Sequence, residues 1–180
     1  MRNSILLLFA LTVCLFAFGP VAAQSTNKTI VLVRHAEKDT SVANNPDPEL
    51  SAEGRERAIK LMNFVKRYKP HEIFSTNYKR TRQTADALET DYRVERNLAP
   101  DVDVAHYLAA SVWPEGPEGC GGTVVLVGHQ PILGRLASLL LCGEEQNWSV
   151  RKGAVWWLTT RDREGRAQVV LRSVINPEQL

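Results

Sequence analysis

Residues 29–37 read TIVLVRHAE, a run of five apolar or β-branched residues followed at once by a cation and an imidazole. A short continuous run of this kind is typical of a strand buried on both faces, as in a parallel sheet. In open α/β sheets the ligand crevice lies beyond the carboxyl ends of such strands. Arg34 and His35 therefore stand where a site is expected. On this stretch alone, a strand end with two solvated polar residues explains them equally well.

The same arrangement occurs a second time in the chain. Residues 123–129 read TVVLVGH, so another apolar strand delivers His129 at its carboxyl end. A shorter strand at residues 72–75 is followed by a helix with Arg80 in its first turns. If these strands are parallel neighbours, their carboxyl ends meet at one edge of the sheet.

Such an edge would bring Arg34, His35, Arg80 and His129 around one crevice. Two guanidinium groups and two imidazoles favour an anion, and arginine binds phosphate oxygens in a bidentate fork. A metal site is disfavoured because Arg34 beside His35 repels a cation, and the sequence lacks a His-x-x-x-His motif. Phosphate is the natural occupant, and no metal or other cofactor is expected.

The remaining pattern predicts alternating strands and helices. Ser51 is a plausible N-cap for a helix that ends before Pro70, and Thr76 or Asn77 can cap the helix that carries Arg80. Further helices are predicted at residues 101–110 and from Pro131 to Gly143, and a β-hairpin at residues 154–174. This order predicts a three-layer α/β/α sandwich with a mostly parallel central sheet and a C-terminal β-hairpin.

The first 23 residues have the pattern of an export signal. A basic start at Arg2 precedes an apolar run over residues 5–18, and small residues end at Ala23. The run is shorter than the roughly 20 residues of a membrane span. We expect cleavage before Gln24, a single domain at residues 24–180, and a periplasmic or secreted protein without stable membrane insertion. An uncleaved anchor is the alternative.

Charge and cysteine content restrict the class of protein further. The chain has 22 Lys and Arg against 20 Asp and Glu, a balance that argues against a nucleic-acid partner. After cleavage two cysteines remain, Cys120 just before a strand and Cys142 at the end of the following helix. Because that helix runs back antiparallel to the strand, the sequence predicts a Cys120–Cys142 disulfide in an exported protein.

Three motifs in order resemble the histidine phosphatase superfamily. They are VRHAE at residues 33–37, Ser75-x4-Arg80-Thr81-x-Gln83-Thr84-Ala85, and Val127-Gly128-His129. The resemblance extends from about residue 29 to residue 175. It is greatest to the small SixA-like branch, which the stretch at residues 97–101 and Lys152-Gly153-Ala154 also fit. The resemblance implies a phosphoglycerate mutase-like fold.

The resemblance also implies roles for the four clustered residues. His35 would be the nucleophile that forms a phosphohistidine, and Arg34, Arg80 and His129 would hold the phosphoryl oxygens. Imidazole is a competent nucleophile once one ring nitrogen is free of its proton. We expect His129 to be protonated, because a cation suits a phosphate clamp better than a base does.

The general acid is the open position in this motif set. Some members of the superfamily carry an Asp directly after the second histidine, but here Gln130 follows His129, which excludes the acid-phosphatase and phytase pattern. Asp101, Asp103 and Glu37 remain as candidates, with Asp101 assigned first. Asp101 or Asp103 could instead cap a helix. Glu37 and Lys152 are also candidate substrate contacts.

Together these features predict a metal-independent phosphatase that hydrolyses phosphomonoesters or phosphohistidine through His35. Its partner would be a phosphorylated small molecule or a phosphoprotein. A phosphate-binding module of the same fold with little turnover is the alternative, because the acid is missing. A phosphomutase is disfavoured because the chain lacks long insertions to hold a sugar phosphate while it reorients.

Overall fold

The computed structural model describes residues 27–114 and 122–180. The predicted signal segment and Cys120 lie outside these residues. Cys142 is exposed at the end of its helix, and its pairing with Cys120 stays a prediction. No helix within the described residues is both long and apolar enough to cross a membrane.

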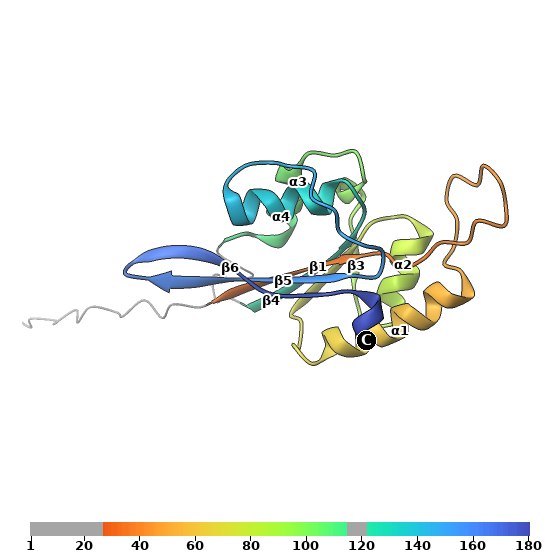
Figure 1. Cartoon of the computed structure of the whole chain (residues 1–180), viewed down its shortest axis with the longest axis horizontal. Helices are drawn as coiled ribbons and strands as arrows, with labels where there is room; N and C mark the ends of the chain where they lie inside the picture. Colours follow the sequence, from red (N-terminus) through yellow and green to blue (C-terminus); the bar gives the residue numbers. More distant parts are fainter. Residues whose placement is uncertain (1–26, 115–121) are drawn as a thin grey trace, which may run out of the picture.

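A six-stranded sheet forms the centre of the domain, with the order β3-β2-β4-β1-β5-β6 (Figure 1). Its strands are β1 (Lys28–Arg34), β2 (Glu72–Ser75), β3 (Arg93–Val94), β4 (Gly122–Gly128), β5 (Val155–Arg163) and β6 (Arg166–Ile175). Strands β3, β2, β4 and β1 are parallel, whereas β5 and β6 form an antiparallel hairpin beside β1. The predicted mostly parallel sheet with a C-terminal hairpin is confirmed.

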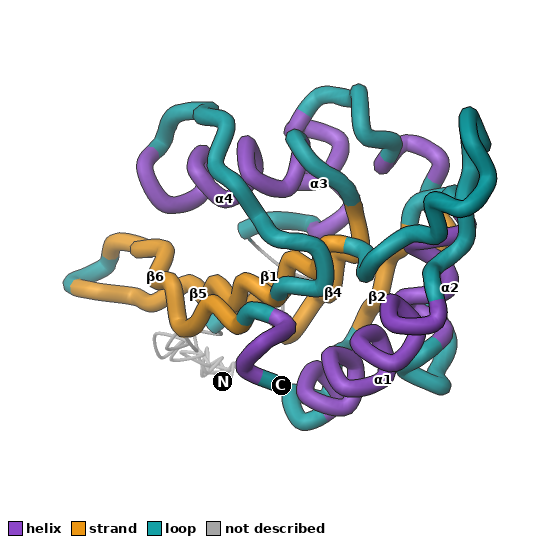
Figure 2. The backbone as a smooth tube through the Cα atoms, turned by 45° about the vertical axis from the view of Figure 1, so that its right-hand side comes forward, coloured by secondary structure: helices purple, strands orange, loops and turns teal. Residues whose placement is uncertain are grey.

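Helices cover both faces of this sheet, as the views in Figures 1 and 2 show. The helices are α1 (Ala52–Lys66), α2 (Lys79–Asp86), α3 (Val104–Ser111) and α4 (Ile132–Cys142), with 3₁₀ turns at Arg96–Leu98 and Pro177–Gln179. α1 and α2 pack on one face, and α3 and α4 on the other. The predicted α/β/α layering is confirmed.

Strand β1 is buried on both faces, which explains its unbroken apolar sequence. Ile30 and Leu32 are fully buried in the core beneath α3 and α4, and Val31 and Val33 are buried in the core beneath α1 and α2. Each such side chain contributes roughly 1.5–3 kcal/mol by its burial. Strand β1 therefore belongs to both cores at once.

The parallel register aligns the strand ends that carry the candidate site. Arg34 of β1 pairs with Gly128 of β4, and Val127 of β4 pairs with Ser75 of β2. Three adjacent strands thus end at the same level, so the residues that follow them meet at one edge of the sheet.

The N-terminus of α1 is capped as expected, whereas the N-terminus of α2 is not. The Ser51 side chain caps α1 by accepting from the backbone N–H of Gly54 at 3.0 Å, as predicted. The prediction that Thr76 or Asn77 caps α2 is wrong. The N-cap of α2 is Tyr78, which makes no side-chain capping bond. Thr76 has another partner, described below.

Close backbone approach explains a glycine inside α4. A Cβ atom at Gly134 would lie 1.8 Å from the carbonyl oxygen of Trp148. No side chain fits at that distance, so the helix interior accepts glycine despite its cost of about 1 kcal/mol relative to alanine. The absence of a side chain lets residues 146–150 pack directly on the start of α4.

Candidate active site

A polar cavity of about 200 Å³ opens at the carboxyl ends of β1, β2 and β4. Its lining comes from the strand ends, from α2, from the loop at residues 39–49 and from the turn before β5. The lining residues are Arg34, His35, Lys38, Asn45, Pro46, Pro48, Arg80, Pro100, His129, Gln130 and Lys152. The structure thus brings together the four residues that the sequence placed in one crevice. Beside them lie Lys152, a candidate substrate contact, and Lys38, which had no predicted role.

His35 is held in the tautomer that a nucleophile needs. Its ring is 5 % exposed, and its Nδ1 lies 2.7 Å from the carbonyl oxygen of Ala36. A carbonyl can accept but not donate, so Nδ1 carries the proton and Nε2 keeps its lone pair. Burial lowers the pKa of His35 to about 4, and the charges of Arg80, Arg34 and Lys152 add to this effect, against the opposing hydrogen bond to Ala36. The ring is therefore neutral at pH 7.

His129 is held in the opposite tautomer. Its Nδ1 faces Nη2 of Arg80 at 3.3 Å, and because arginine only donates, Nδ1 is the acceptor. Its Nε2–H then donates to Oγ1 of Thr76 at 2.8 Å. Thr76 Oγ1 lies 2.6 Å from Thr81 Oγ1, which in turn donates to the carbonyl oxygen of Tyr78. This chain of hydroxyl groups fixes which nitrogen of His129 faces the cavity.

The charge of His129 differs from the sequence-based expectation. Burial, followed by the charges of Arg80, His35 and Arg34, lowers its pKa to about 3. His129 is therefore neutral in the ligand-free cavity. The expectation of a protonated ring overlooked the cost of burying a third cation beside two arginines.

Tilted and edge-on ring contacts surround the two histidines, and Arg80 packs on Tyr78. The centroids of His35 and His129 are 5.3 Å apart, and Tyr78 meets His129 edge-on at 4.9 Å. The guanidinium carbon of Arg80 lies 4.5 Å from the centre of the Tyr78 ring, a cation–π distance. Burial lowers the pKa of Arg80, and Asp47, whose Oδ1 is 3.6 Å from its Nη1, opposes that effect.

Arg34 carries a donor that is not satisfied within the protein. Its Nη1 donates to the carbonyl oxygen of Val150 at 2.7 Å. Its Nε–H is buried and has no hydrogen-bond partner among the described residues. Leaving a buried donor unpaired costs about 1–3 kcal/mol, more beside a charge, so an anion in the cavity would recover that energy.

None of the three candidate acids lines this cavity. Asp103 accepts from the backbone N–H of Ala105 at 2.7 Å as the N-cap of α3, as the alternative explanation held. Asp101 is exposed, although its neighbour Pro100 reaches the cavity wall. Glu37 pairs with Arg57 at 2.6 Å. The sequence suggested that one of these three carboxyl groups lies in the site, but none of them lines the cavity.

Gln130 has a structural role in place of the absent acid. Its Oε1 accepts from the backbone N–H of Gly134 at 3.1 Å, and its Nε2 donates to the carbonyl oxygen of Trp148 at 2.7 Å. The amide thereby joins the start of α4 to residues 146–150 at the edge of the cavity.

Several residues that had no predicted role at the cavity organise the site. Thr76 and Thr81 orient His129, Thr84 Oγ1 accepts from the backbone N–H of Ala36 at 3.2 Å, and Gln83 accepts from the N–H of Leu50 at 2.7 Å. The signal was present, because the motif after Ser75 is rich in hydroxyl and amide side chains. Their partners lie on other segments, however, so the sequence alone could not assign them.

The described residues hold no cluster of three or more His, Cys, Asp or Glu side chains suited to a metal ion. A larger hollow of about 500 Å³ beside β3 and α3 contains His106. It does not include any of the four clustered residues.

The fold is phosphoglycerate mutase-like, with a cavity at the strand ends that is lined by cationic side chains. The family model of the histidine phosphatase superfamily (branch 1) matches residues 30–103, which include Arg34, His35 and Arg80 but not His129. No curated protein matches the sequence at a significant level.

Solved structures show the same fold. A protein histidine phosphatase SixA complexed with tungstate is 20% identical, with a TM-score of 0.65 over 83% of this chain and 97% of that chain. A protein assigned as SixA from Nakamurella multipartitia is 23% identical, with a TM-score of 0.66 over 85% and 98%. A mycobacterial glucosyl-3-phosphoglycerate phosphatase is 21% identical, with a TM-score of 0.60 over 80% and 96%.

The two buried neutral histidines predict a pH-dependent stability. Both pKa values lie below the unfolded value of about 6.5, so the unfolded chain binds more protons between pH 6.5 and about 4. The contribution of the two histidines to the free energy of unfolding is therefore fully present above pH 6.5. The free energy of unfolding falls as the pH drops below that value, by up to about 1.4 kcal/mol per pH unit for each histidine.

Urea unfolding at pH 7.0, 6.0 and 5.0 measures this slope. His35→Asn and His129→Asn should each reduce it, whereas His71→Asn, which replaces an exposed histidine outside the cavity, should leave it unchanged. Equal slopes in all four proteins would contradict the burial argument.

Proposed function

We propose that the chain is a SixA-like member of the histidine phosphatase superfamily and that it hydrolyses phosphorylated substrates through a phosphohistidine at His35. The observation that carries the proposal is the hydrogen bond from His35 Nδ1 to Ala36, which leaves the Nε2 lone pair available in a cavity lined by Arg34 and Arg80. The family match over residues 30–103 and the phosphatases of the same fold support it.

In the first step the Nε2 lone pair attacks phosphorus. A P–N bond forms while the P–O bond to the leaving group breaks, and that oxygen leaves with the bonding electron pair. The attacking ring then carries a positive charge, with its single N–H proton still on Nδ1 and donated to the Ala36 carbonyl. The fixed hydrogen bond therefore stabilises the charge that develops on the ring.

The phosphoryl oxygens are bound by donors already in place. Arg34 and Arg80 line the cavity, and a preorganised donor needs no rearrangement when charge develops. A bound dianion also raises the pKa of His129. The ring can then take up a proton on Nδ1 and donate to a phosphoryl oxygen, so a bound substrate would add His129 to the cationic groups of Arg34 and Arg80.

In the second step water attacks the phosphohistidine. The new P–O bond forms as the P–N bond breaks, the electron pair returns to His35 Nε2, and the water loses its proton to solvent or to the departing phosphate. The ring recovers its starting tautomer because Nδ1 keeps its proton throughout. The cycle assigns no role to a metal ion.

A second candidate function is a phosphate-binding module with little turnover. It is favoured by one observation, that no carboxyl group of a described residue lines the cavity. Without a general acid, the leaving oxygen must depart unprotonated or take its proton from water. A phosphomutase has no comparable observation in its favour.

Release of phosphate from p-nitrophenyl phosphate by the protein from residue 24 onward separates these candidates. We expect turnover that survives a chelator such as EDTA and falls by at least about 10³-fold in His35→Asn, which removes the nucleophile. His106→Asn is the control, because His106 is exposed and lies outside the cavity. Tight phosphate binding without turnover would favour the binding module, and loss of activity in EDTA would contradict the metal-free mechanism.

The missing acid predicts a steep dependence on the leaving group. Aryl phosphates leave as stabilised phenolates and need little protonation, whereas alkyl phosphates leave as basic alkoxides. We expect kcat/KM to rise by about 10²-fold or more from phenyl phosphate to p-nitrophenyl phosphate, since proton donation typically contributes 10²–10⁴-fold. A flat series of aryl phosphates would indicate a proton donor that the structure does not place in the cavity.

We also propose that the protein is exported, cleaved after Ala23 and bridged between Cys120 and Cys142. The basic and apolar pattern of residues 1–23 and the even cysteine count of the remainder support this proposal. The intact mass of protein recovered outside the cytoplasm should match a chain beginning at Gln24 minus two hydrogens. A mass that includes residues 1–23 would reject the cleavage after Ala23, and two alkylatable thiols would reject the Cys120–Cys142 disulfide.

A further inference from the structure

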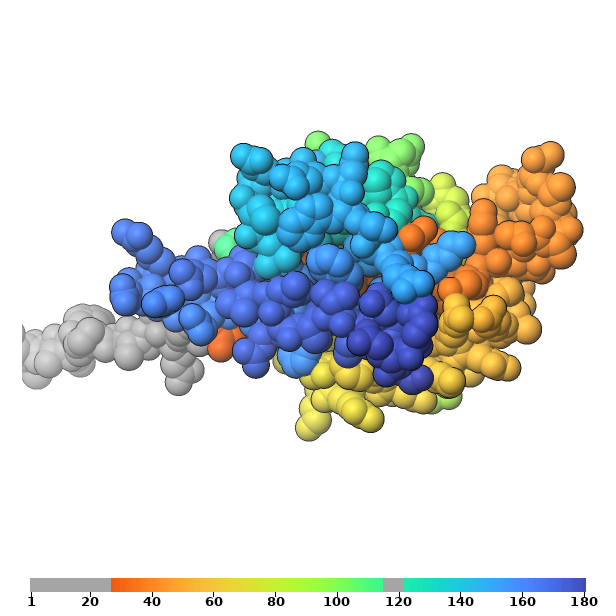
Figure 3. All heavy atoms as spheres, in the orientation of Figure 1, coloured from red at the N-terminus to blue at the C-terminus, as the bar shows by residue number. Residues whose placement is uncertain are grey.

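Two lysines line the cavity in addition to the arginines. Lys38 follows β1 and lies at the base of the loop at residues 39–49, and Lys152 lies in the turn before β5. Figure 3 shows these segments side by side at the surface, the orange of residues 38–50 against the blue of residues near 150. Neither lysine is needed by the mechanism proposed above.

Backbone hydrogen bonds fix the position of both lysines. Next to Lys152, the N–H of Gly153 lies 3.1 Å from the carbonyl oxygens of both Arg34 and His35. Gly153 has a φ of +66°, which a residue with a side chain adopts only with strain. Lys38 forms an isolated bridge with Leu50, whose N–H donates to Gln83. The backbone segments that carry the two lysines are therefore held in place at the side of the cavity.

The charges around the cavity are unevenly compensated. Arg80 has Asp47 at 3.6 Å, and Glu37 acts electrostatically on Arg34. Lys38 and Lys152 form no ion pair with any residue in the described ranges 27–114 and 122–180. With both histidines neutral, the cavity wall holds four cationic side chains and, among those same residues, no acidic one. A phosphoryl dianion neutralises two of these charges.

We propose that the preferred substrates carry a second anionic group, a carboxylate or a second phosphate, within a few bonds of the phosphoryl group. In this arrangement Arg34 and Arg80 hold the phosphoryl group, and Lys152 with Lys38 binds the second anion. The inference rests on the proposed function. Its geometric basis is that all four cations share one cavity of about 200 Å³, so the second anion must belong to a compact molecule or a short side chain.

Binding of small phosphonates tests this inference without any need for turnover. Titration calorimetry would compare ethylphosphonate, which has one anionic group, with phosphonoacetate and methylenediphosphonate, which add a carboxylate or a second phosphonate. We expect one or both two-anion probes to bind about tenfold or more tightly than ethylphosphonate, as one well-placed charge pair allows. Whichever binds more tightly identifies the second anion. The advantage should shrink as ionic strength rises.

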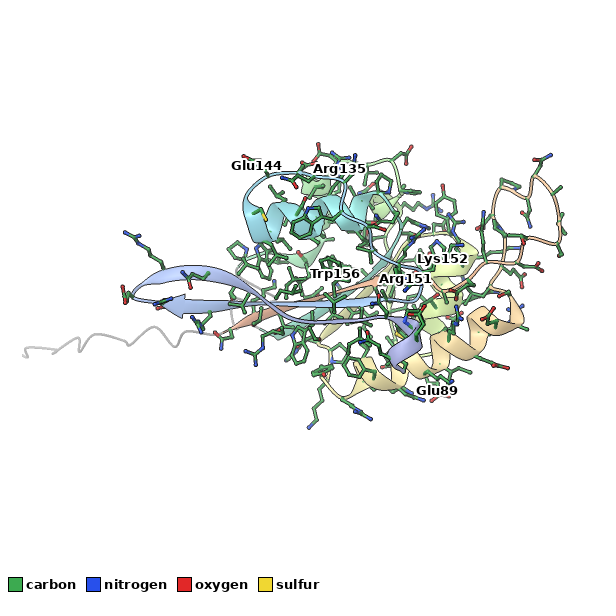
Figure 4. The ribbon with its side chains drawn as sticks, viewed as in Figure 1. Glu89, Arg135, Glu144, Arg151, Lys152 and Trp156 are labelled. Carbon is green, nitrogen blue, oxygen red and sulfur yellow. The ribbon has the colours of Figure 1, made fainter. Side chains whose placement is uncertain are left out.

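Variants that remove one positive charge show which lysine causes the tighter binding of the two-anion probes. Lys152→Met, alone and with Lys38→Met, should reduce the ratio to within about twofold, because it weakens binding of the two-anion probes more than binding of ethylphosphonate. Arg151→Met is the matched control, because it removes the same charge one residue away from Lys152 (both are labelled in Figure 4). Arg151 pairs with Glu178 at 3.0 Å and does not line the cavity.

Equal binding of the three probes by wild type would overturn the inference, as would a ratio that persists in the double variant. Either result leaves the phosphatase proposal intact, because turnover of p-nitrophenyl phosphate depends on His35. Conversely, a protein that never turns over can still show the predicted ratio, so the two proposals fail separately.

Discussion

The site depends on the parallel register between β1 and β4. Because Arg34 pairs with Gly128, the two strands end at the same level and deliver His35 and His129 to one cavity. A slip of one residue would exchange the side chains that β1 presents to the two cores, which differ in shape, and would move Arg34 and His35 out of line with the end of β4. The same hydrophobic contacts that hold the sheet together therefore set the distance between the two histidine rings, 5.3 Å between centroids.

Burial then decides the chemistry of those rings. A low dielectric surrounding and two neighbouring guanidinium groups keep both imidazoles neutral, and each ring's hydrogen-bond partner selects its tautomer. The carbonyl of Ala36 keeps a proton on Nδ1 of His35, whereas Arg80 and Thr76 together keep it on Nε2 of His129. The two histidines, each at the end of a similar strand, thus differ in chemistry. His35 has a free electron pair on Nε2, whereas His129 has an unprotonated Nδ1 that could take up a proton when an anion binds.

The sequence predicted the sheet, its layers and the grouping of the two arginines and two histidines, because those features follow from hydrophobic periodicity and strand direction. It could not predict the contacts of Thr76, which was expected to cap α2 but instead holds His129, because that choice depends on a partner 53 residues away. Asp101, the first candidate for the acid, is exposed and does not line the cavity, so its role stays a prediction. Asp103 caps the start of α3, the local role that the sequence also allowed.

The amide of Gln130 limits how the missing acid could be restored. One end of this side chain accepts a hydrogen bond from Gly134 and the other donates to the carbonyl of Trp148. A carboxylate in its place would set an acceptor against an acceptor at Trp148 and would loosen the segment that lies against Gly134, where no Cβ fits. In this lineage, gaining proton donation directly after the second histidine would require rebuilding the start of α4 as well as changing one side chain. The proposed catalyst would therefore remain suited to leaving groups that depart without protonation.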